Sequence, residues 1–174
     1  MIIFIKLNWI KIEIIGRDDL MEMRIEIPSI EDLKRVNKLA VQVHEMHVNL
    51  DPDLYKSVEK VISKGYFEIL VKNEEIYVAK LENEIVGYII FNIKEKENPS
   101  MRYRKQLNID AICVEEKCRG KGIGTKLLEE IKNIAKSKGC TDLYLTVNRE
   151  NEHAIKVYEK FGFKVKNIAY MMRI

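Results

Sequence analysis

Residues 118–128 read CRGKGIGTKLL, with three glycines at alternate positions directly before an apolar pattern of helical spacing. Basic residues surround the glycines, namely Lys117, Arg119, Lys121 and Lys126. A helix N-terminus offers unpaired N–H groups and partial positive charge, and glycine lets a ligand come close to the backbone. The stretch therefore predicts a strand-to-helix loop that binds an anionic group, and a pyrophosphate is the expected ligand.

Two common phosphate-binding loops do not fit this stretch. A Walker loop requires GxxxxGK[ST], whereas Thr125-Lys126 follows Gly124. A dinucleotide fingerprint requires GxGxxG after the first strand of a βαβ unit, and here the glycines alternate deep in the chain. A regulator that binds ATP or NAD is therefore disfavoured.

The composition limits the classes of protein. A length of 174 residues suits one domain, and 47% hydrophobic with 33% charged residues is a globular balance rather than a disordered one. A net charge of +3 is too small to indicate nucleic-acid binding, and no apolar run is long enough to cross a bilayer, so we expect neither a nucleic acid nor a membrane as partner. Three cysteines without a CxxC predict free thiols and a cytoplasmic protein.

Residues 1–22 are interpreted as an N-terminal extension of a single domain that spans residues 23–174. In the extension, Ile10, Ile12 and Ile14 alternate with polar residues, which predicts an extra strand with a bulge near Trp9. The alternative is that the natural protein starts at Met21 or Met23 and that the extension is a start-site artefact.

Periodicity and turn residues predict a mixed α/β domain, in which helices pack on a largely antiparallel sheet. Ser29 and Asp32 resemble a capping box at the start of the first helix, and Gly65 is read as the stop of the second. Residues 94–104 are expected to form a charged loop, and residues 66–72 fit a helix or a strand. The expected strands are 23–27, 75–81, 85–93, 105–114, 143–147 and 163–172, and the expected helices are 29–49, 54–63, 123–138 and 152–161.

A second motif, NEHAIKVYEKFGF at residues 151–163, follows the predicted strand LYLTV. Its Asn151, Ala154, Tyr158 and Gly162-Phe163 match the pattern N-x-x-A-x-x-x-Y-x-x-x-G-F. Together with Arg119-x-x-Gly122-x-Gly124, in this order, the motif resembles the GNAT family of N-acetyltransferases. The resemblance covers residues 23–174 and implies the acyl-CoA N-acyltransferase fold.

The resemblance implies acetyl-CoA as acetyl donor, bound where two neighbouring parallel strands splay apart. Its pantetheine would pair with the strand 105–114 and its pyrophosphate would lie on the loop N–H groups. The implied cofactor-binding residues are Ile112, Cys113, Val114, Arg119, Gly120, Lys121, Gly122, Ile123, Gly124, Thr125, Asn151, Ala154 and Tyr158.

The resemblance further implies direct acetyl transfer to a primary amine in a ternary complex, with Tyr158 as the acid that protonates the leaving thiolate. The base is left open: Asp110 is the first candidate, because it has the parity of Ile112 and Val114 on one strand, and Glu115 and Glu116 lie just past that strand. His44 and His47 are expected to line the acceptor pocket. Their spacing, HEMH, is not the HExxH zinc motif, and we expect no metal.

The sequence leaves the identity of the acceptor open. A small-molecule amine is slightly favoured over a peptide or protein amine. The alternative from another class is a non-catalytic acetyl-CoA sensor or interaction module. The apolar last strand and the extension also suggest a homodimer surface.

Overall fold

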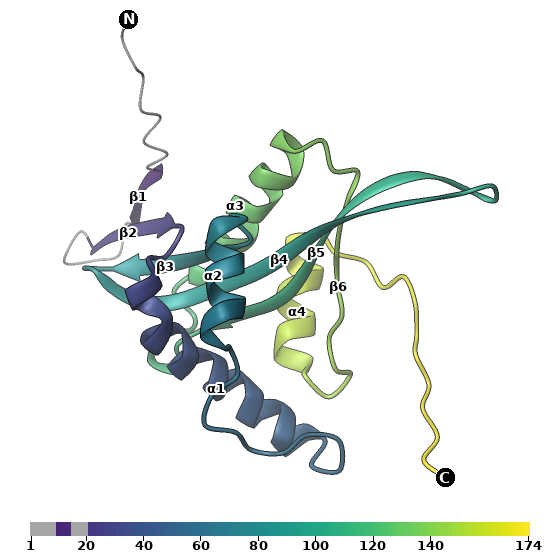
Figure 1. Cartoon of the computed structure of the whole chain (residues 1–174), viewed down its shortest axis with the longest axis horizontal. Helices are drawn as coiled ribbons and strands as arrows, with labels where there is room; N and C mark the ends of the chain where they lie inside the picture. Colours follow the sequence, from purple (N-terminus) through teal and green to yellow (C-terminus); the bar gives the residue numbers. More distant parts are fainter. Residues whose placement is uncertain (1–9, 15–20) are drawn as a thin grey trace, which may run out of the picture.

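Six strands form one sheet in which neighbours along the chain are neighbours in space, in the order β1-β2-β3-β4-β5-β6. The computed structural model describes residues 10–14 and 21–174. Every neighbouring pair is antiparallel except β5 and β6, which run parallel. The mixed, largely antiparallel sheet that the sequence predicted is confirmed (Figure 1). The strands are β1 (Ile10–Ile14), β2 (Met21–Glu26), β3 (Ile76–Leu81), β4 (Glu84–Asn98), β5 (Met101–Val114) and β6 (Asp142–Leu145).

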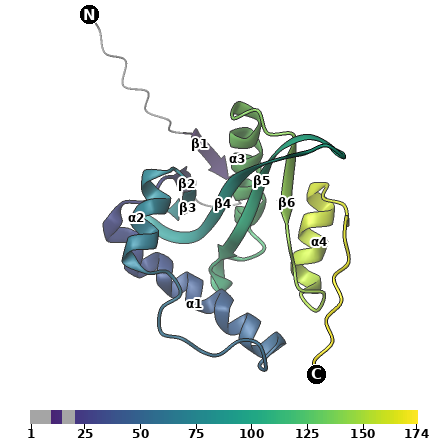
Figure 2. The same ribbon diagram turned by 45° about the vertical axis from the view of Figure 1, so that its right-hand side comes forward.

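Helices cover both faces of the sheet, and each face has its own hydrophobic cluster (Figures 1 and 2). Helices α1 (Leu33–Leu50) and α2 (Lys64–Lys72) bury residues such as Val36, Leu39 and Phe67 against one face. On the other face α3 (Ile123–Ser137) buries Ile123, Leu127 and Ile131, with α4 (Glu152–Phe161) packed at its border. None of the helices in the described ranges is long and apolar enough to cross a membrane.

The capping box at the start of the first helix is confirmed. Ser29 Oγ and its backbone N–H both lie within hydrogen-bond distance of Asp32 Oδ2, at 3.1 and 2.9 Å. A short 3-10 turn (Ile30–Asp32) leads from this box into α1. The helix over residues 152–161 is also confirmed as predicted, and it ends at Gly162, whose φ of 109° suits glycine.

The helix expected over residues 54–63 is absent from the structure, and Gly65 is not a helix stop. The chain from 51 to 63 is a loop, Ser63 caps α2, and Gly65 lies in the first turn of that helix. Asn37 of α1 explains the loop, because its side chain bonds the backbone of Val61 and Ile62 at 2.8–3.1 Å. A side chain distant in sequence therefore satisfies backbone groups that a helix would have paired.

Two further expectations on the strands are wrong. Residues 94–104 are not a loop, because β4 and β5 continue as one antiparallel hairpin up to the pair Asn98 and Met101. Residues 163–174 were expected to contain a last strand, but the structure assigns no strand to them. At the other end, β1 lies where an extra strand was predicted, while the expected bulge near Trp9 falls outside the described residues.

Gly87 lies where β4, β5 and α3 come closest together. A Cβ atom placed on Gly87 would stand 2.8 Å from the backbone oxygen of Cys113 and 3.4 Å from the Leu127 side chain. Because a backbone oxygen cannot move away without disturbing the ladder, any larger residue here pushes two strands apart.

We expect Gly87→Ala to lower the free energy of unfolding by about 1–3 kcal/mol, as overpacking does in well-packed cores. Gly65→Ala is the matched control, because nothing lies within 4 Å of its added Cβ and alanine favours a helix. Urea denaturation of both variants checks this. Equal midpoints for Gly87→Ala and the wild type would contradict the close packing at Gly87.

Candidate active site

The strands β5 and β6 separate halfway along β5. They pair in parallel only from Gln106 with Asp142 to Ile109 with Leu145. Beyond Ile109, β5 runs on to Val114, still paired with β4 but with no partner on the β6 side among the described residues. The splay that the family resemblance implied is therefore present, and it leaves unpaired backbone groups along one edge of β5.

A β-bulge marks the point where the strands separate. Ile90 pairs with Ala111 and Phe91 with Ile109, so Asp110 is the extra residue in β5. The bulge shifts the phase of the strand, because Ile112 and Val114 border the cluster of α3 whereas Ala111 borders that of α1. The expectation that Asp110 shares a face with Ile112 and Val114 is therefore wrong.

Asp110 instead lies on the face covered by α1 and α2. The amide of Asn92 donates a hydrogen bond of 2.5 Å to Asp110 Oδ2, and Asn108 in turn donates to Asn92 Oδ1 at 3.2 Å. Burial raises the pKa of Tyr66 on α2, and the negative charges of Asp110 and Glu75 raise it further. The carboxylate is thus exposed and oriented by an amide chain.

The glycine loop leaves open space at the start of α3. Gly120 and Gly122 have φ values of 76° and 78°, and an added Cβ on either would meet nothing within 4 Å. Gly122 is the N-cap and provides no side-chain hydrogen bond to the first helical N–H groups. The predicted positions Lys121, Gly124 and Thr125 border this space, whereas the Ile123 side chain is in the core and offers only its backbone.

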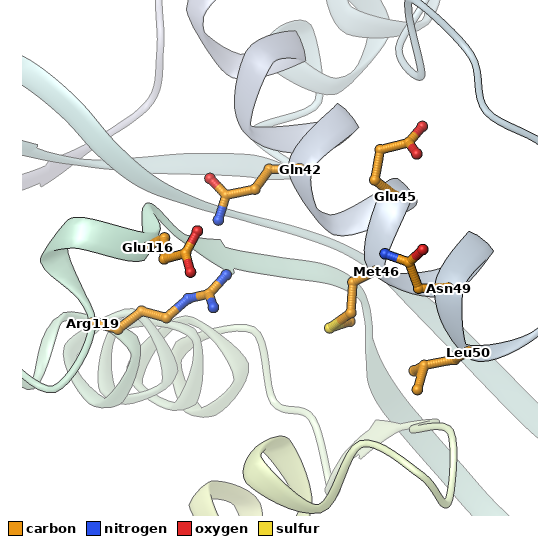
Figure 3. A pocket seen from close by; sticks show the side chains of 7 residues that line it. All are labelled: Gln42, Glu45, Met46, Asn49, Leu50, Glu116 and Arg119. Atoms are coloured by element: carbon orange, nitrogen blue, oxygen red, sulfur yellow. The ribbon is translucent and has the colours of Figure 1, made fainter.

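A cavity of about 330 Å³ lies between α1 and the end of β5 (Figure 3). Arg119 reaches into it, and its Nε also donates to the oxygen of Val114 at 3.2 Å. The Gln42 amide points into the cavity towards Glu116 and Arg119, and its Nε2 is buried without a hydrogen-bond partner. The lining residues are Gln42, Glu45, Met46, Asn49, Leu50, Glu116 and Arg119.

A residue of the cavity lining links α1 with the start of α4. Met46, which lines the cavity, accepts a contact of 3.7 Å at its sulfur from the Asn151 amide. Sequence reasoning missed this face of α1. The signal that it overlooked is the spacing i, i+3, i+4 and i+7 of Gln42, Glu45, Met46 and Asn49, which places them on one side of a helix.

The two predicted acceptor histidines lie on the other side of α1. His44 Nε2 is 2.8 Å from the oxygen of Lys56, and the ring of Tyr55 stands between His44 and His47, at 6.1 and 5.6 Å. Burial lowers the pKa of His47, and the charge of His44 lowers it further. Both histidines therefore contact the loop after α1 and lie away from the cavity.

Helix α4 brings the second motif to the same opening. Asn151 caps the helix through a bond of 3.2 Å from the Ala154 N–H, which leaves its amide nitrogen facing Met46. Tyr158 packs edge-on against Phe163 at 5.8 Å and borders the same cluster as Ile112 and Val114. Burial raises the pKa of Tyr158, so its hydroxyl keeps its proton at neutral pH.

Cys113 is buried and donates weakly to the oxygen of Leu39 at 3.5 Å. Burial raises the pKa of this thiol to about 12. Because the thiolate is the nucleophile, a thiol that stays protonated is a poor acyl carrier. This environment therefore makes Cys113 a poor candidate for an acyl carrier.

The sequence profile of the acetyltransferase (GNAT) family matches residues 40–163. The chain belongs to this family.

An uncharacterized N-acetyltransferase of Methanocaldococcus jannaschii is 30% identical over 118 residues, or 67% of this chain and 51% of that protein. The N-alpha-acetyltransferase 50 of Danio rerio is 33% identical over 59% of the chain and 58% of that protein. The spermine/spermidine N(1)-acetyltransferase of Bacillus subtilis is 30% identical over 48% and 55%. The chain thus spans somewhat more than half the length of these curated relatives.

Solved structures share this architecture. A mutant of the BH1408 protein from Bacillus halodurans has a TM-score of 0.83 at 27% identity, covering 86% of this chain and 98% of that one. An aminoglycoside N-acetyltransferase in complex with CoA has a TM-score of 0.69 at 15% identity over 90% and 97% of the two chains, a likeness of fold alone.

Acetyl-CoA is the donor that the GNAT fold uses, and the site fits it. The open space before Gly120 and Gly122 can take phosphate groups, since no atom of the described residues lies within 4 Å of a Cβ added there and the helix N-terminus faces it. The free edge of β5 up to Val114 offers backbone groups to the amides of a pantetheine arm.

The environment of His47 predicts a loss of stability in mild acid. Because its pKa in the folded protein lies below the unfolded value of 6.5, folding favours neutral His47. This contribution is complete above pH 6.5 and is lost as the pH falls through the lowered folded pKa. In His47→Phe, which keeps a ring beside Tyr55 but cannot titrate, we expect a smaller fall in stability between pH 7.5 and 5.5. Urea midpoints at these pH values measure it, and parallel profiles would refute it.

Proposed function

We propose that this GNAT protein transfers the acetyl group of acetyl-CoA directly to a primary amine bound in the same complex. The observation that carries the proposal is the opening between β5 and β6, with the glycine loop at its end. Asp110 lies on one face of the sheet beside this opening, and Tyr158 packs on the other. An exposed carboxylate and a protonated hydroxyl are the base and acid that amine acylation needs.

The proposed roles divide between strand, loop and helix. The N–H groups of residues 119–125 and the Asn151 amide hold the donor, which supplies an activated acyl group when bound. Asp110, oriented by Asn92, takes the proton of the attacking amine. Tyr158 donates a proton to the departing sulfur. A β5 N–H near Val114 stabilises the negative charge on the carbonyl oxygen.

We favour a small cationic amine over a peptide as acceptor. The acceptor side carries acidic groups, with Asp110 and Glu75 near Tyr66 and with Glu45 and Glu116 at the cavity. Such groups attract a polyamine or a similar amine. Relatives named for spermine and spermidine and for protein N-termini make both classes reasonable. We place the reaction in the cytoplasm, because all three cysteines are free.

The test of the function is acceptor-dependent release of free thiol from acetyl-CoA. The panel contains polyamines, amino acids, aminoglycosides and short peptides. We expect release with small amines at a higher kcat/KM than with peptides. Tight binding of acetyl-CoA without release for any amine would favour a non-catalytic sensor, and absence of binding would refute the donor site.

Tyr158→Phe tests the acid. We expect kcat to fall about 100-fold, because general acid catalysis typically contributes at least that much. The dissociation constant for acetyl-CoA should change less than about twofold, since the ring and its packing remain. Steady-state kinetics and calorimetric titration measure the two quantities.

Tyr144→Phe is the matched control for this change. Tyr144 is a half-buried tyrosine of β6 with Lys96 above its ring at 5.7 Å. Its loss of a hydroxyl should leave kcat unchanged. A normal kcat in Tyr158→Phe would remove Tyr158 as the acid.

A further inference from the structure

The cavity between α1 and the end of β5 has polar side chains on two facing walls (Figure 3). Helix α1 supplies the Gln42 amide, and the segment that follows β5 supplies Glu116 and Arg119. A volume of about 330 Å³ is at the small end of the range of ligand sites, so the cavity suits a small molecule better than a peptide.

Two hydrogen-bond donors face this cavity without a partner among the described residues. Gln42 Nε2 is buried and has no acceptor. Arg119 donates from Nε to the oxygen of Val114 at 3.2 Å, which leaves its two terminal nitrogens for another partner. Figure 3 shows the amide and the guanidinium directed towards each other. Because a buried donor without an acceptor is costly, the two groups indicate a ligand oxygen between them.

Glu116 places a negative charge beside these two donors. Its carboxylate points into the same space in Figure 3, and no residue in the described ranges forms an ion pair with it. A simple anion would be attracted by Arg119 and repelled by Glu116, and a simple cation would meet the reverse. A ligand with a carboxylate and an ammonium group close together pairs with both side chains at once. The α-amino acid group has this arrangement.

The rest of the cavity lining favours a ligand with an apolar stem and a second positive charge. Met46 and Leu50, one turn apart on α1, offer apolar surface to methylene groups. Glu45 at the cavity adds a second carboxylate, so negative groups outnumber the single guanidinium. Asp110, the proposed base, precedes Val114 by four residues of β5, or roughly 13 Å at 3.3 Å per residue. An amine at Asp110 must therefore be separated from the charged end by a long stem.

We propose that the cavity binds the α-amino acid end of a dibasic amino acid, whose distal primary amine is the acetyl acceptor. The side chains of Gln42 and Arg119 hold the carboxylate, Glu116 holds the α-ammonium group, and Met46 and Leu50 lie along the stem. The donor contact proposed above for Arg119 uses its backbone N–H, so its side chain is available. This inference rests on the proposed acetyl transfer and narrows the small cationic amine to one chemical class.

Three ligands test the two ends of the amino acid group separately. Free L-lysine carries both groups, 1,5-diaminopentane lacks only the carboxylate, and 6-aminohexanoate lacks only the α-ammonium group. Calorimetric titration of the full chain, with and without saturating CoA, gives the dissociation constants. We expect lysine to bind about 10-fold more tightly than either analogue, because each analogue leaves a charged hydrogen bond unmade. Equal affinity for lysine and 1,5-diaminopentane, or no binding of lysine, would overturn the proposal.

Gln42→Leu and Glu116→Gln are matched controls for each other, since both nearly keep the size of the side chain. Gln42→Leu should reduce the preference for lysine over 1,5-diaminopentane about fivefold and keep the preference over 6-aminohexanoate. Glu116→Gln should do the opposite. Circular dichroism verifies that both variants are folded. Equal losses of affinity for all three ligands would indicate a structural role, and weaker binding of acetyl-CoA alone would assign the cavity to the donor. Either result would contradict the proposal.

Turnover distinguishes this inference from the function on which it rests. Preferential binding of lysine without release of thiol from acetyl-CoA for any amine would refute acetyl transfer and retain the amino acid site. Release of thiol with other amines, together with no binding of lysine, would refute the amino acid site alone.

Discussion

The bulge at Asp110 is the feature on which the geometry of the site depends. Strand β5 must pair with β4 along its length, yet it must leave β6 after Ile109. An extra residue bends and twists the strand that carries it, and it does so here at the residue after the last β5–β6 pair. The bulge therefore coincides with the point where the sheet opens, and it leaves Asp110 on the face of α1 and α2 while Ile112 and Val114 lie on the face of α3. The strand remains paired with β4 on its other side.

The walls of the opening are fixed by contacts that reach across the fold. Arg35 of α1 pairs with Glu115 at 2.9 Å and donates to the oxygen of Ile85 at 2.8 Å. The Glu115 N–H in turn bonds to the oxygen of Val86 at 2.7 Å. Helix α1, the start of β4 and the residue after β5 are thus tied together, which holds Gln42 and Arg119 on facing walls of one cavity.

Sequence patterns predicted the parts of the fold that depend on local chemistry. The glycine loop, the capping box at Ser29 and the helix α4 follow from caps, from glycine conformations and from helical spacing over a few residues. The same patterns misplaced the second helix, because buried Asn37 satisfies the loop at Val61 and Ile62 from another part of the chain. They also missed the bulge, since register depends on the partner strand, and with it the face on which Asp110 lies.

The candidate site likewise contains some residues that local sequence patterns predict and others that depend on distant contacts. Motif residues such as Arg119, Gly122 and Asn151 were found because their spacing is itself the signal. The cavity face of α1 was not found, because choosing between its two polar faces requires knowing what packs on each. Gln42 faces the cavity and His47 faces Tyr55, although both lie on one helix and both are polar.

The long hairpin of β4 and β5 has a consequence for solubility. Beyond Phe91 on β4 and before Lys105 on β5, the ribbon pairs with no third strand among the described residues, so both of its edges are open there (Figure 1). Lysine and glutamate alternate over residues 94–97 of β4, Arg102 and Arg104 flank Tyr103 on β5, and Glu95 faces Lys105 at 3.9 Å. A strand from another molecule would have to strip water from these charges, so the ribbon resists edge-to-edge aggregation.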